Sequence, residues 1–152
     1  VTTSSFGHRF TSFDMDNLQA ERSFTAIRQY GLTKLANILF TRELDARAAS
    51  RGITANCFHP GAVGTEFAQD DSSSLLGFGT KIGKVFLRSP KKGGETGVFL
   101  ATDPAALSKH GLYWSDKKAR NTSGDVSDKN AVALWERSTE LLGLADLALR
   151  AA

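Results

Sequence analysis

The sequence has 152 residues but only one cysteine, one methionine and three prolines. Cys57 cannot form a disulfide within the chain, which favours a reducing compartment, and we expect a cytoplasmic protein. Neither Cys57 nor the three histidines, His8, His59 and His110, form a metal-ligand spacing with one another or with an acidic cluster. No metal site is therefore expected.

Long apolar runs and strong charge asymmetry are also missing. The most apolar stretch, 75–87, is interrupted by glycine, threonine and lysine, so no membrane-spanning segment is expected. The net charge is +3 and the basic residues are dispersed, which argues against a nucleic-acid partner. The sequence Gly-x-Ser-x-Gly does not occur, so a hydrolase nucleophile elbow is unsupported.

What is present is the composition of a globular protein, with 41% apolar and 23% charged residues. The length suits one compact domain with a hydrophobic core. The chain opens with Val1-Thr2-Thr3-Ser4-Ser5, which has no methionine and is typical of the inside of a strand. We therefore expect residues 1–152 to be part of a longer chain, and a leader peptide cannot be judged.

Periodicity and turn signals predict an alternation of strands and helices. We expect strands at 1–5, 53–58 and 111–114, and helices at 25–50, 89–102 and from Ser127 or Asp128 to 142. Segment 6–24 is expected to be a loop with one turn of helix, 116–127 a loop and 68–88 a helical flap. Strand–helix–strand order predicts an α/β protein with a parallel sheet.

Tyr30 and Lys34 are four residues apart and therefore share one face of the predicted helix. A phenol is almost wholly protonated at neutral pH, and a nearby cation favours its ionised form, so the pair could serve as a general acid/base. Taken alone, however, the pair is better explained as a core tyrosine beside a solvated lysine.

Polar residues follow two of the predicted strands. Ser4-Ser5 ends the first, where a hydroxyl could bind a substrate oxygen, although two serines ending a strand in a turn explain the pair better. The segment from His59 to Glu66 follows the second strand, and its Pro60-Gly61 turn and Thr65 could hold a ligand; a plain strand-to-helix turn explains it equally well. His59 is better explained as a structural or pocket-wall residue than as a base.

The order of these three signals resembles the short-chain dehydrogenase/reductase family, and most closely its retinol-dehydrogenase-like branch. The resemblance covers residues 1 to about 143 and rests on Val1–His8, on the run from Tyr30 to Leu44 and on His59–Glu66. The long separation of Ser5 from Tyr30 is also similar to that branch.

The resemblance implies the C-terminal portion of a doubly wound parallel-sheet, Rossmann-type domain. The family's glycine-rich turn, its cofactor selector and its catalytic asparagine precede the serine strand and are not in this sequence. We therefore expect the N-terminal cofactor-binding half to be absent from residues 1–152, which together form part of one domain.

The resemblance implies roles for particular residues. Tyr30 matches the catalytic acid/base, Lys34 the residue that favours its ionisation and binds the nicotinamide ribose, and Ser5 the serine that polarises the carbonyl. The resemblance also implies contacts with the cofactor for residues of the first strand, the helix and the turn after the second strand: Thr3, Tyr30, Lys34, Pro60, Gly61, Val63 and Thr65.

The implied activity is an NAD(P)-dependent interconversion of an alcohol and a carbonyl, with NADP slightly favoured over NAD. The apolar residues of the 68–88 flap suggest a lipophilic small-molecule substrate. The 25–50 helix matches one that often pairs subunits, so a homo-oligomer is compatible with the sequence. Three alternatives stay open: a non-catalytic nucleotide-binding or regulatory protein of the same fold, an inactive truncated fragment, and a reductase of carbon–carbon double bonds.

Overall fold

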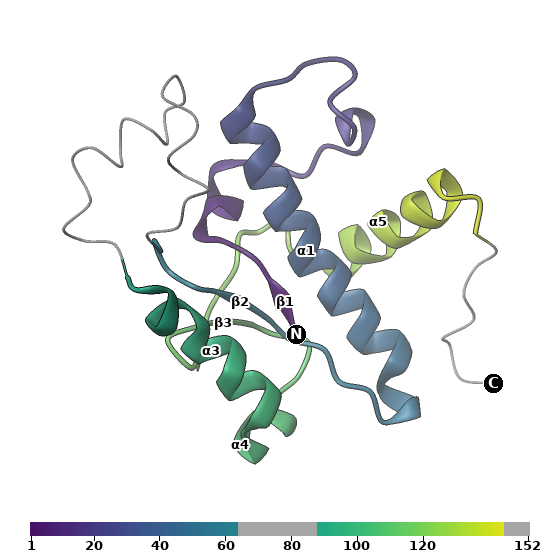
Figure 1. Ribbon diagram of the computed structural model, residues 1–152. Helices are drawn as coiled ribbons and strands as arrows, with labels where there is room; N and C mark the ends of the chain where they lie inside the picture. Colours follow the sequence, from purple (N-terminus) through teal and green to yellow (C-terminus); the bar gives the residue numbers. More distant parts are fainter. Residues whose placement is uncertain (64–87, 145–152) are drawn as a thin grey trace.

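The computed structural model describes residues 1–63 and 88–144, which form a four-stranded sheet flanked by helices (Figure 1). Strands β1 (Thr2–Thr3), β2 (Cys57–His59) and β3 (Tyr113–Ser115) are parallel, and β4 (Lys118–Ala119) is antiparallel to β3. The order in the sheet is β1-β2-β3-β4. The predicted α/β class is confirmed.

The helices begin and end where the sequence provides caps. Their bounds are α1 (Ala26–Ala48), α3 (Pro90–Thr102), α4 (Pro104–Leu107) and α5 (Asp128–Leu141). The hydroxyl of Ser89 accepts a hydrogen bond from the Lys92 amide at the start of α3, and Ser127 does the same for Asn130 at the start of α5. Gly52 ends the short turn η3 (Ala49–Arg51) with φ of 72°, a conformation that suits glycine.

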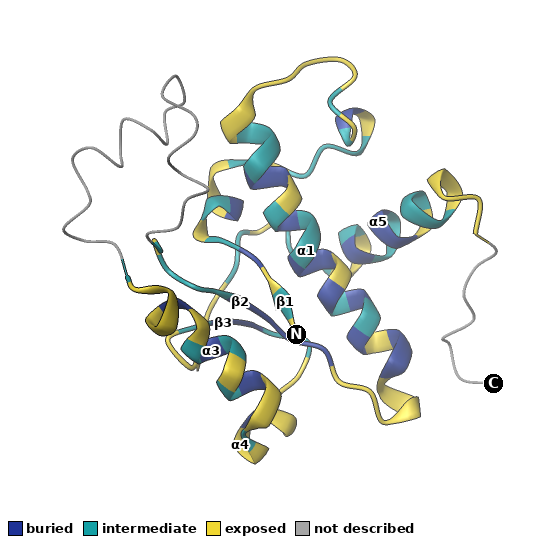
Figure 2. Cartoon of the chain, in the orientation of Figure 1, coloured by how far each residue is buried: buried dark blue, intermediate teal, exposed yellow. Residues whose placement is uncertain are grey.

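Neighbouring residues of one strand face opposite sides of the sheet, and this places α1 and α3 on different faces (Figures 1 and 2). Cys57 and Tyr113 pack with Ile38 of α1. Phe58 and Trp114, the next residues along β2 and β3, pack with Leu100 of α3 on the other side. One small core therefore packs α1 against one face of β2 and β3, and a second packs α3 against the other face.

Helix α5 lies against α1 on the side away from the strands (Figure 1). Leu35 and Leu39 of α1 form a buried cluster with Ala131 and Leu134 of α5. Helix α1 is therefore packed between the strands on one side and α5 on the other. This packing supports the side chains in the N-terminal half of α1, which include Tyr30 and Lys34.

Several predicted boundaries are wrong. The second strand begins at Cys57 rather than Ile53, which is 46% exposed, and the third runs from Tyr113 to Ser115 rather than over 111–114. The predicted loop 116–127 contains β4. Segment 6–24, predicted as a loop with one turn of helix, contains two 3-10 turns, η1 (Phe6–Phe10) and η2 (Met15–Asn17). The short helix α4 was not predicted. The 68–88 flap lies outside the described residues except for Arg88.

Among the described residues, no helix combines the length and the apolar character needed to cross a bilayer.

Candidate active site

The predicted site residues come from two neighbouring strands and one helix. Ser5 follows β1 and Pro60 follows β2, and because these strands are parallel their carboxyl ends lie at the same edge of the sheet. Ligands of open α/β sheets bind at this edge. Helix α1 packs beside β1, and its residues Tyr30 and Lys34 lie near this carboxyl edge of the sheet.

The two serines after β1 differ in their surroundings. Ser4 is 2% exposed, and its hydroxyl donates to the backbone carbonyl of Lys34 at 2.8 Å, so it ties β1 to α1. The hydroxyl oxygen of Ser5 is only half-buried and accepts from the Gly7 amide at 3.1 Å. Because Ser5 accepts that bond, its own hydrogen can be donated to a further acceptor. This geometry favours Ser5 over Ser4 as the serine that meets a substrate.

Tyr30 lies beside Ser5 because two glycines let η1 and α1 approach closely. A methyl group built on Gly7 would lie 3.1 Å from Cε1 of Tyr30 and 3.5 Å from Oγ of Ser5. A methyl group on Gly31 would lie 2.9 Å from the carbonyl oxygen of Gly7. The phenol ring and the serine hydroxyl therefore flank the same glycine, and no larger residue fits at Gly31 without moving the backbone of η1.

Lys34 is one helical turn beyond Tyr30. Its Nζ lies 5.5 Å from the centroid of the Tyr30 ring, so the cation and the phenol share one face of α1, as predicted. One turn further, the side-chain amide of Asn37 donates from Nδ2 to the carbonyl oxygen of Thr3 at 3.0 Å. The bonds from Ser4 and Asn37 therefore fix α1 against β1 directly below the tyrosine and lysine.

The Pro60–Val63 turn has a backbone that only a small residue permits. Gly61 has φ of 86°, and a methyl group on it would lie 2.6 to 2.9 Å from three atoms of the Arg88 side chain. Val63 forms an isolated parallel bridge with Arg88, and its Cγ2 lies 2.5 Å from the position of a methyl group on Gly93 of α3. Of the predicted cofactor contacts in this turn, Pro60, Gly61 and Val63 are described, whereas Thr65 lies outside the described residues.

Two histidines lie next to these residues. Burial lowers the pKa of His59, as does the nearby Arg88, and Asp116 opposes the shift. His8 is fully buried, its Nδ1 lies 2.7 Å from the carbonyl oxygen of Ser5, and its ring packs edge-on to Tyr113 at 4.9 Å. Burial lowers the pKa of His8, a shift that the bond to Ser5 opposes. Both rings are therefore favoured in the neutral form.

The sequence did not reveal the contact of His8 with Ser5. The only local signal is a histidine three positions after the serine, which matches no metal or catalytic spacing. The sequence also gave no sign of Arg88 and Asp116, because they are far apart in the chain and meet only in the fold.

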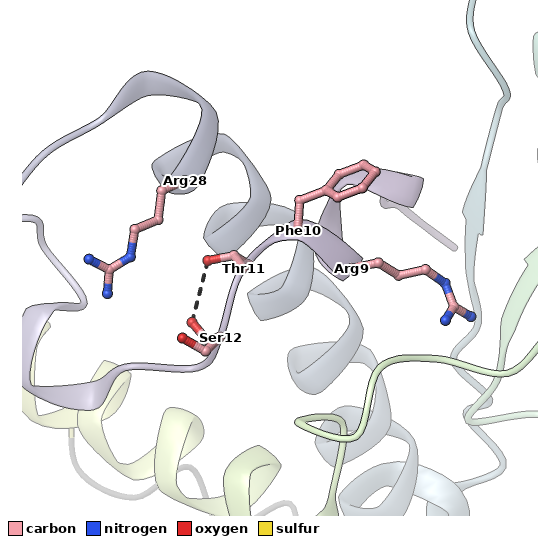
Figure 3. A pocket seen from close by; sticks show the side chains of 5 residues that line it. All are labelled: Arg9, Phe10, Thr11, Ser12 and Arg28. Carbon is pink, nitrogen blue, oxygen red and sulfur yellow. Dashed lines mark hydrogen bonds between the residues drawn. The ribbon is translucent and has the colours of Figure 1, made fainter.

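An open pocket of about 460 Å³ lies beside η1 and the start of α1, and Figure 3 shows the residues that line it: Arg9, Phe10, Thr11, Ser12 and Arg28. Its two guanidinium groups point away from each other. Arg28 pairs with Asp14 at 2.9 Å, and Arg9 donates to the carbonyl oxygen of Asn121. The pocket is therefore not a converging anion site.

Within 1–63 and 88–144, no group of three or more histidine, cysteine or acidic side chains is arranged to hold a metal ion.

The sheet, its two covered faces and the polar residues at its carboxyl edge define an α/β protein with part of a Rossmann-type sheet. No protein-family model matches the chain. Over 147 residues it is 37% identical to retinol dehydrogenase 12 of Mus musculus and 32% identical to retinol dehydrogenase 14 of Homo sapiens. These alignments cover 95% of this chain and 45% and 44% of the relatives, respectively. Polyprenol dehydrogenase of Homo sapiens is 29% identical over 158 residues, covering 98% of this chain and 46% of that protein.

Over nearly its whole length the chain is similar to members of the retinol-dehydrogenase-like branch of the short-chain dehydrogenase/reductase family, and it spans about half the length of the curated relatives it matches. Among solved structures, an uncharacterized protein from Mycobacterium paratuberculosis superposes with a TM-score of 0.68 at 21% identity. That match covers 93% of this chain and 49% of the other, and it supports the fold.

Proposed function

We propose that the intact protein is an NAD(P)-dependent oxidoreductase that interconverts an alcohol and a carbonyl. The observation that carries the proposal is the placement of Tyr30 and Ser5 on either side of Gly7, after the carboxyl end of β1, with the Lys34 ammonium beside the Tyr30 ring. The relatives named above are dehydrogenases, and they match this chain over nearly its whole length.

Each of these side chains has a task that its geometry suits. In carbonyl reduction, the Tyr30 hydroxyl gives its proton to the carbonyl oxygen, and the Ser5 hydroxyl donates a hydrogen bond to the same oxygen. The bond from the Gly7 amide orients the Ser5 hydroxyl, because it occupies a lone pair and leaves the hydrogen for the substrate. The Lys34 ammonium, on the same face of α1, favours the negative charge that the phenol oxygen acquires. In alcohol oxidation the proton moves in the opposite direction.

The described residues fit the nicotinamide end of a dinucleotide. Pro60 and Val63 keep their turn against Gly93 of α3, just after the carboxyl end of β2, where open α/β sheets bind ligands. We expect Pro60, Gly61 and Val63 to hold the nicotinamide end, with Lys34 and Tyr30 on its ribose and Thr3 beside them. A bound NAD(P) supplies hydride-transfer chemistry at its nicotinamide ring.

The substrate we propose is a lipophilic alcohol or aldehyde. Retinol and polyprenol, which appear in the names of the relatives, are both long-chain isoprenoid alcohols. A substrate of this kind places one polar oxygen at Ser5 and Tyr30 and leaves its apolar chain to other parts of the protein.

The proposal is tested with purified intact protein, an isoprenoid aldehyde, and NADPH or NADH, whose oxidation is followed by absorbance. Replacement Tyr30→Phe removes the proton donor and should lower kcat by about 100-fold or more, while Lys34 and the Pro60–Val63 turn still bind the cofactor. The matched control is Tyr113→Phe in the chain's other tyrosine, which should stay active. Full activity of Tyr30→Phe would refute the role of Tyr30, and cofactor binding without turnover over a broad carbonyl panel would instead support a non-catalytic nucleotide-binding protein.

A further inference from the structure

The side chain of Arg88 lies directly across the Pro60–Val63 turn. Its Cδ, Nε and Cζ atoms all lie within 2.9 Å of the position that a methyl group on Gly61 would take. The Arg88 amide also donates to the carbonyl oxygen of Ala62 at 2.7 Å. Both the backbone and the side chain of Arg88 therefore hold this turn.

The side chain of Arg88 crosses Gly61, and its guanidinium group pairs with the carboxylate of Asp116. Its two terminal nitrogens lie 2.5 and 3.2 Å from the two carboxylate oxygens, which is a bidentate pair. This pair lowers the pKa of Asp116 and raises that of Arg88, so both groups are charged at neutral pH. The turn after β2 is thus joined to Asp116 by a charged and directional contact.

Asp116 itself is fixed by the sheet and by α3. It is the first residue of the two-residue turn between β3 and β4, where Asp116 and Lys117 have φ of 54° and 57°. The Lys117 amide donates to the hydroxyl of the buried Thr96 at 3.3 Å. Ser115, just before the turn, is paired with His59 of β2. The carboxylate therefore sits on a support that has a set position relative to the end of β2.

The geometry points to Arg88 and Asp116 as positioning residues that hold the Pro60–Val63 turn in the shape that receives the nicotinamide end of the cofactor. This inference rests on the proposed function. A stability role does not explain the contact well, because the Arg88 and Asp116 side chains are 34% and 45% exposed, and ion pairs at such sites contribute little to folding. Gly61 has no side chain to limit its backbone angles, so the bidentate contact between Arg88 and Asp116 is what restrains the Pro60–Val63 turn.

The first arm of the test needs no cofactor. Hydrogen–deuterium exchange is measured on the unliganded intact protein for a peptide that covers 58–63, in the wild type, Arg88→Gln and Asp116→Asn. Asparagine tolerates the positive φ at position 116, so Asp116→Asn removes the charge without straining the turn. Both variants should speed exchange in this peptide by about threefold, the size expected from a partly exposed pair.

The second arm measures binding and turnover. The dissociation constant for NADPH, taken from nicotinamide fluorescence, should rise by about threefold in each single variant, while kcat and the KM for aldehyde stay within twofold. Because the two residues act through each other, the double variant should bind no worse than the single ones. The matched control is Arg137→Gln, which breaks the Arg137–Glu140 pair on α5 and should leave all readings unchanged.

Unchanged exchange and unchanged NADPH affinity in both single variants would overturn the inference, as would additive effects in the double variant. A uniform loss of thermal stability, aldehyde KM and kcat would also overturn it, because it would indicate a merely structural role. Failure of the proposed function is recognised separately, because the wild type would then bind no dinucleotide and turn over no carbonyl. The exchange measurement would still show whether the Arg88–Asp116 pair restrains the Pro60–Val63 turn.

Discussion

Replacement Gly7→Ala tests the site geometry without removing a reactive group. The new methyl group would lie 3.1 Å from Cε1 of Tyr30, 3.4 Å from its Cδ1 and 3.5 Å from Oγ of Ser5. Gly7 is not among the glycines with positive φ, so its backbone accepts alanine. The perturbation is therefore confined to the space between the phenol and the serine hydroxyl.

The expected magnitude follows from that first distance. A carbon atom at 3.1 Å is a few tenths of an ångström too close, and the Tyr30 ring has to move by that amount. Because a misplacement of about 1 Å can cost about 100-fold in rate, we expect kcat to fall by about three- to tenfold. Stability should change little, since alanine gains about 0.4–1 kcal/mol from the unfolded chain and loses some of it to the tight contact.

The assay compares kcat, KM and thermal unfolding of Gly7→Ala with those of the wild type. The control is Gly124→Ala, whose methyl group meets nothing within 4 Å and which should retain full activity. An unchanged kcat in Gly7→Ala would refute the placement of Tyr30 beside Ser5. A loss of rate that is matched by a large drop in melting temperature would refute the claim that the effect is local.

Three further predictions follow from other parts of the structure. Gly61→Ala forces a β-carbon into a φ of 86° and against Arg88, so denaturant titration should show a loss of about 1–2 kcal/mol or more in the free energy of unfolding. Burial raises the pKa of the Cys57 thiol to about 12, so iodoacetamide at pH 8 should modify it only when the protein is unfolded, as mass spectrometry would report. Burial lowers the pKa of His8 and His59 below 6.5, so the stability they contribute is complete above that pH. It is lost as the pH falls, because the unfolded chain then binds more protons, and urea titrations from pH 7 to about 5 should show a smaller loss in His8→Asn.

Helices α1, α3 and α5 could be predicted because their signals are local. Ser89 followed by Pro90, Ser127 before α5, and Gly52 after α1 each mark a helix end through a hydrogen bond or a backbone angle that a few neighbouring residues decide. The alternation of these helices with short strands was sufficient to predict a parallel α/β sheet.

The parts that could not be predicted depend on contacts between distant residues. The turn of the β3–β4 hairpin has Asp116-Lys117 at its two positive φ positions, without the glycine that normally signals such a turn, and it is held by Arg88 and Thr96. Strand β2 begins only at Cys57: the carbonyl oxygen of Asn56 still accepts a hydrogen bond from the Thr2 amide of β1, but Ile53 and Thr54 are exposed and have no strand partner.

The candidate site shows the same division. The spacing of Tyr30 and Lys34 already placed them on one helix face, and the resemblance already assigned Ser5 rather than Ser4. The physical difference between the two serines lies in their partners in space. Nothing in the sequence indicated that Gly7 and Gly31 face each other, although their contact is what brings the phenol to the serine.

The proposed reaction transfers a hydride between a nicotinamide and a carbonyl, with Tyr30 as the proton donor. The most direct measurement supplies the intact protein with an isoprenoid aldehyde and NADPH that carries two deuterium atoms at C4 of the nicotinamide, and analyses the product by mass spectrometry. We expect an alcohol with one deuterium on its carbinol carbon, and a loss of that product in Tyr30→Phe. No alcohol from the wild type, or an alcohol without deuterium, would contradict the proposed reaction.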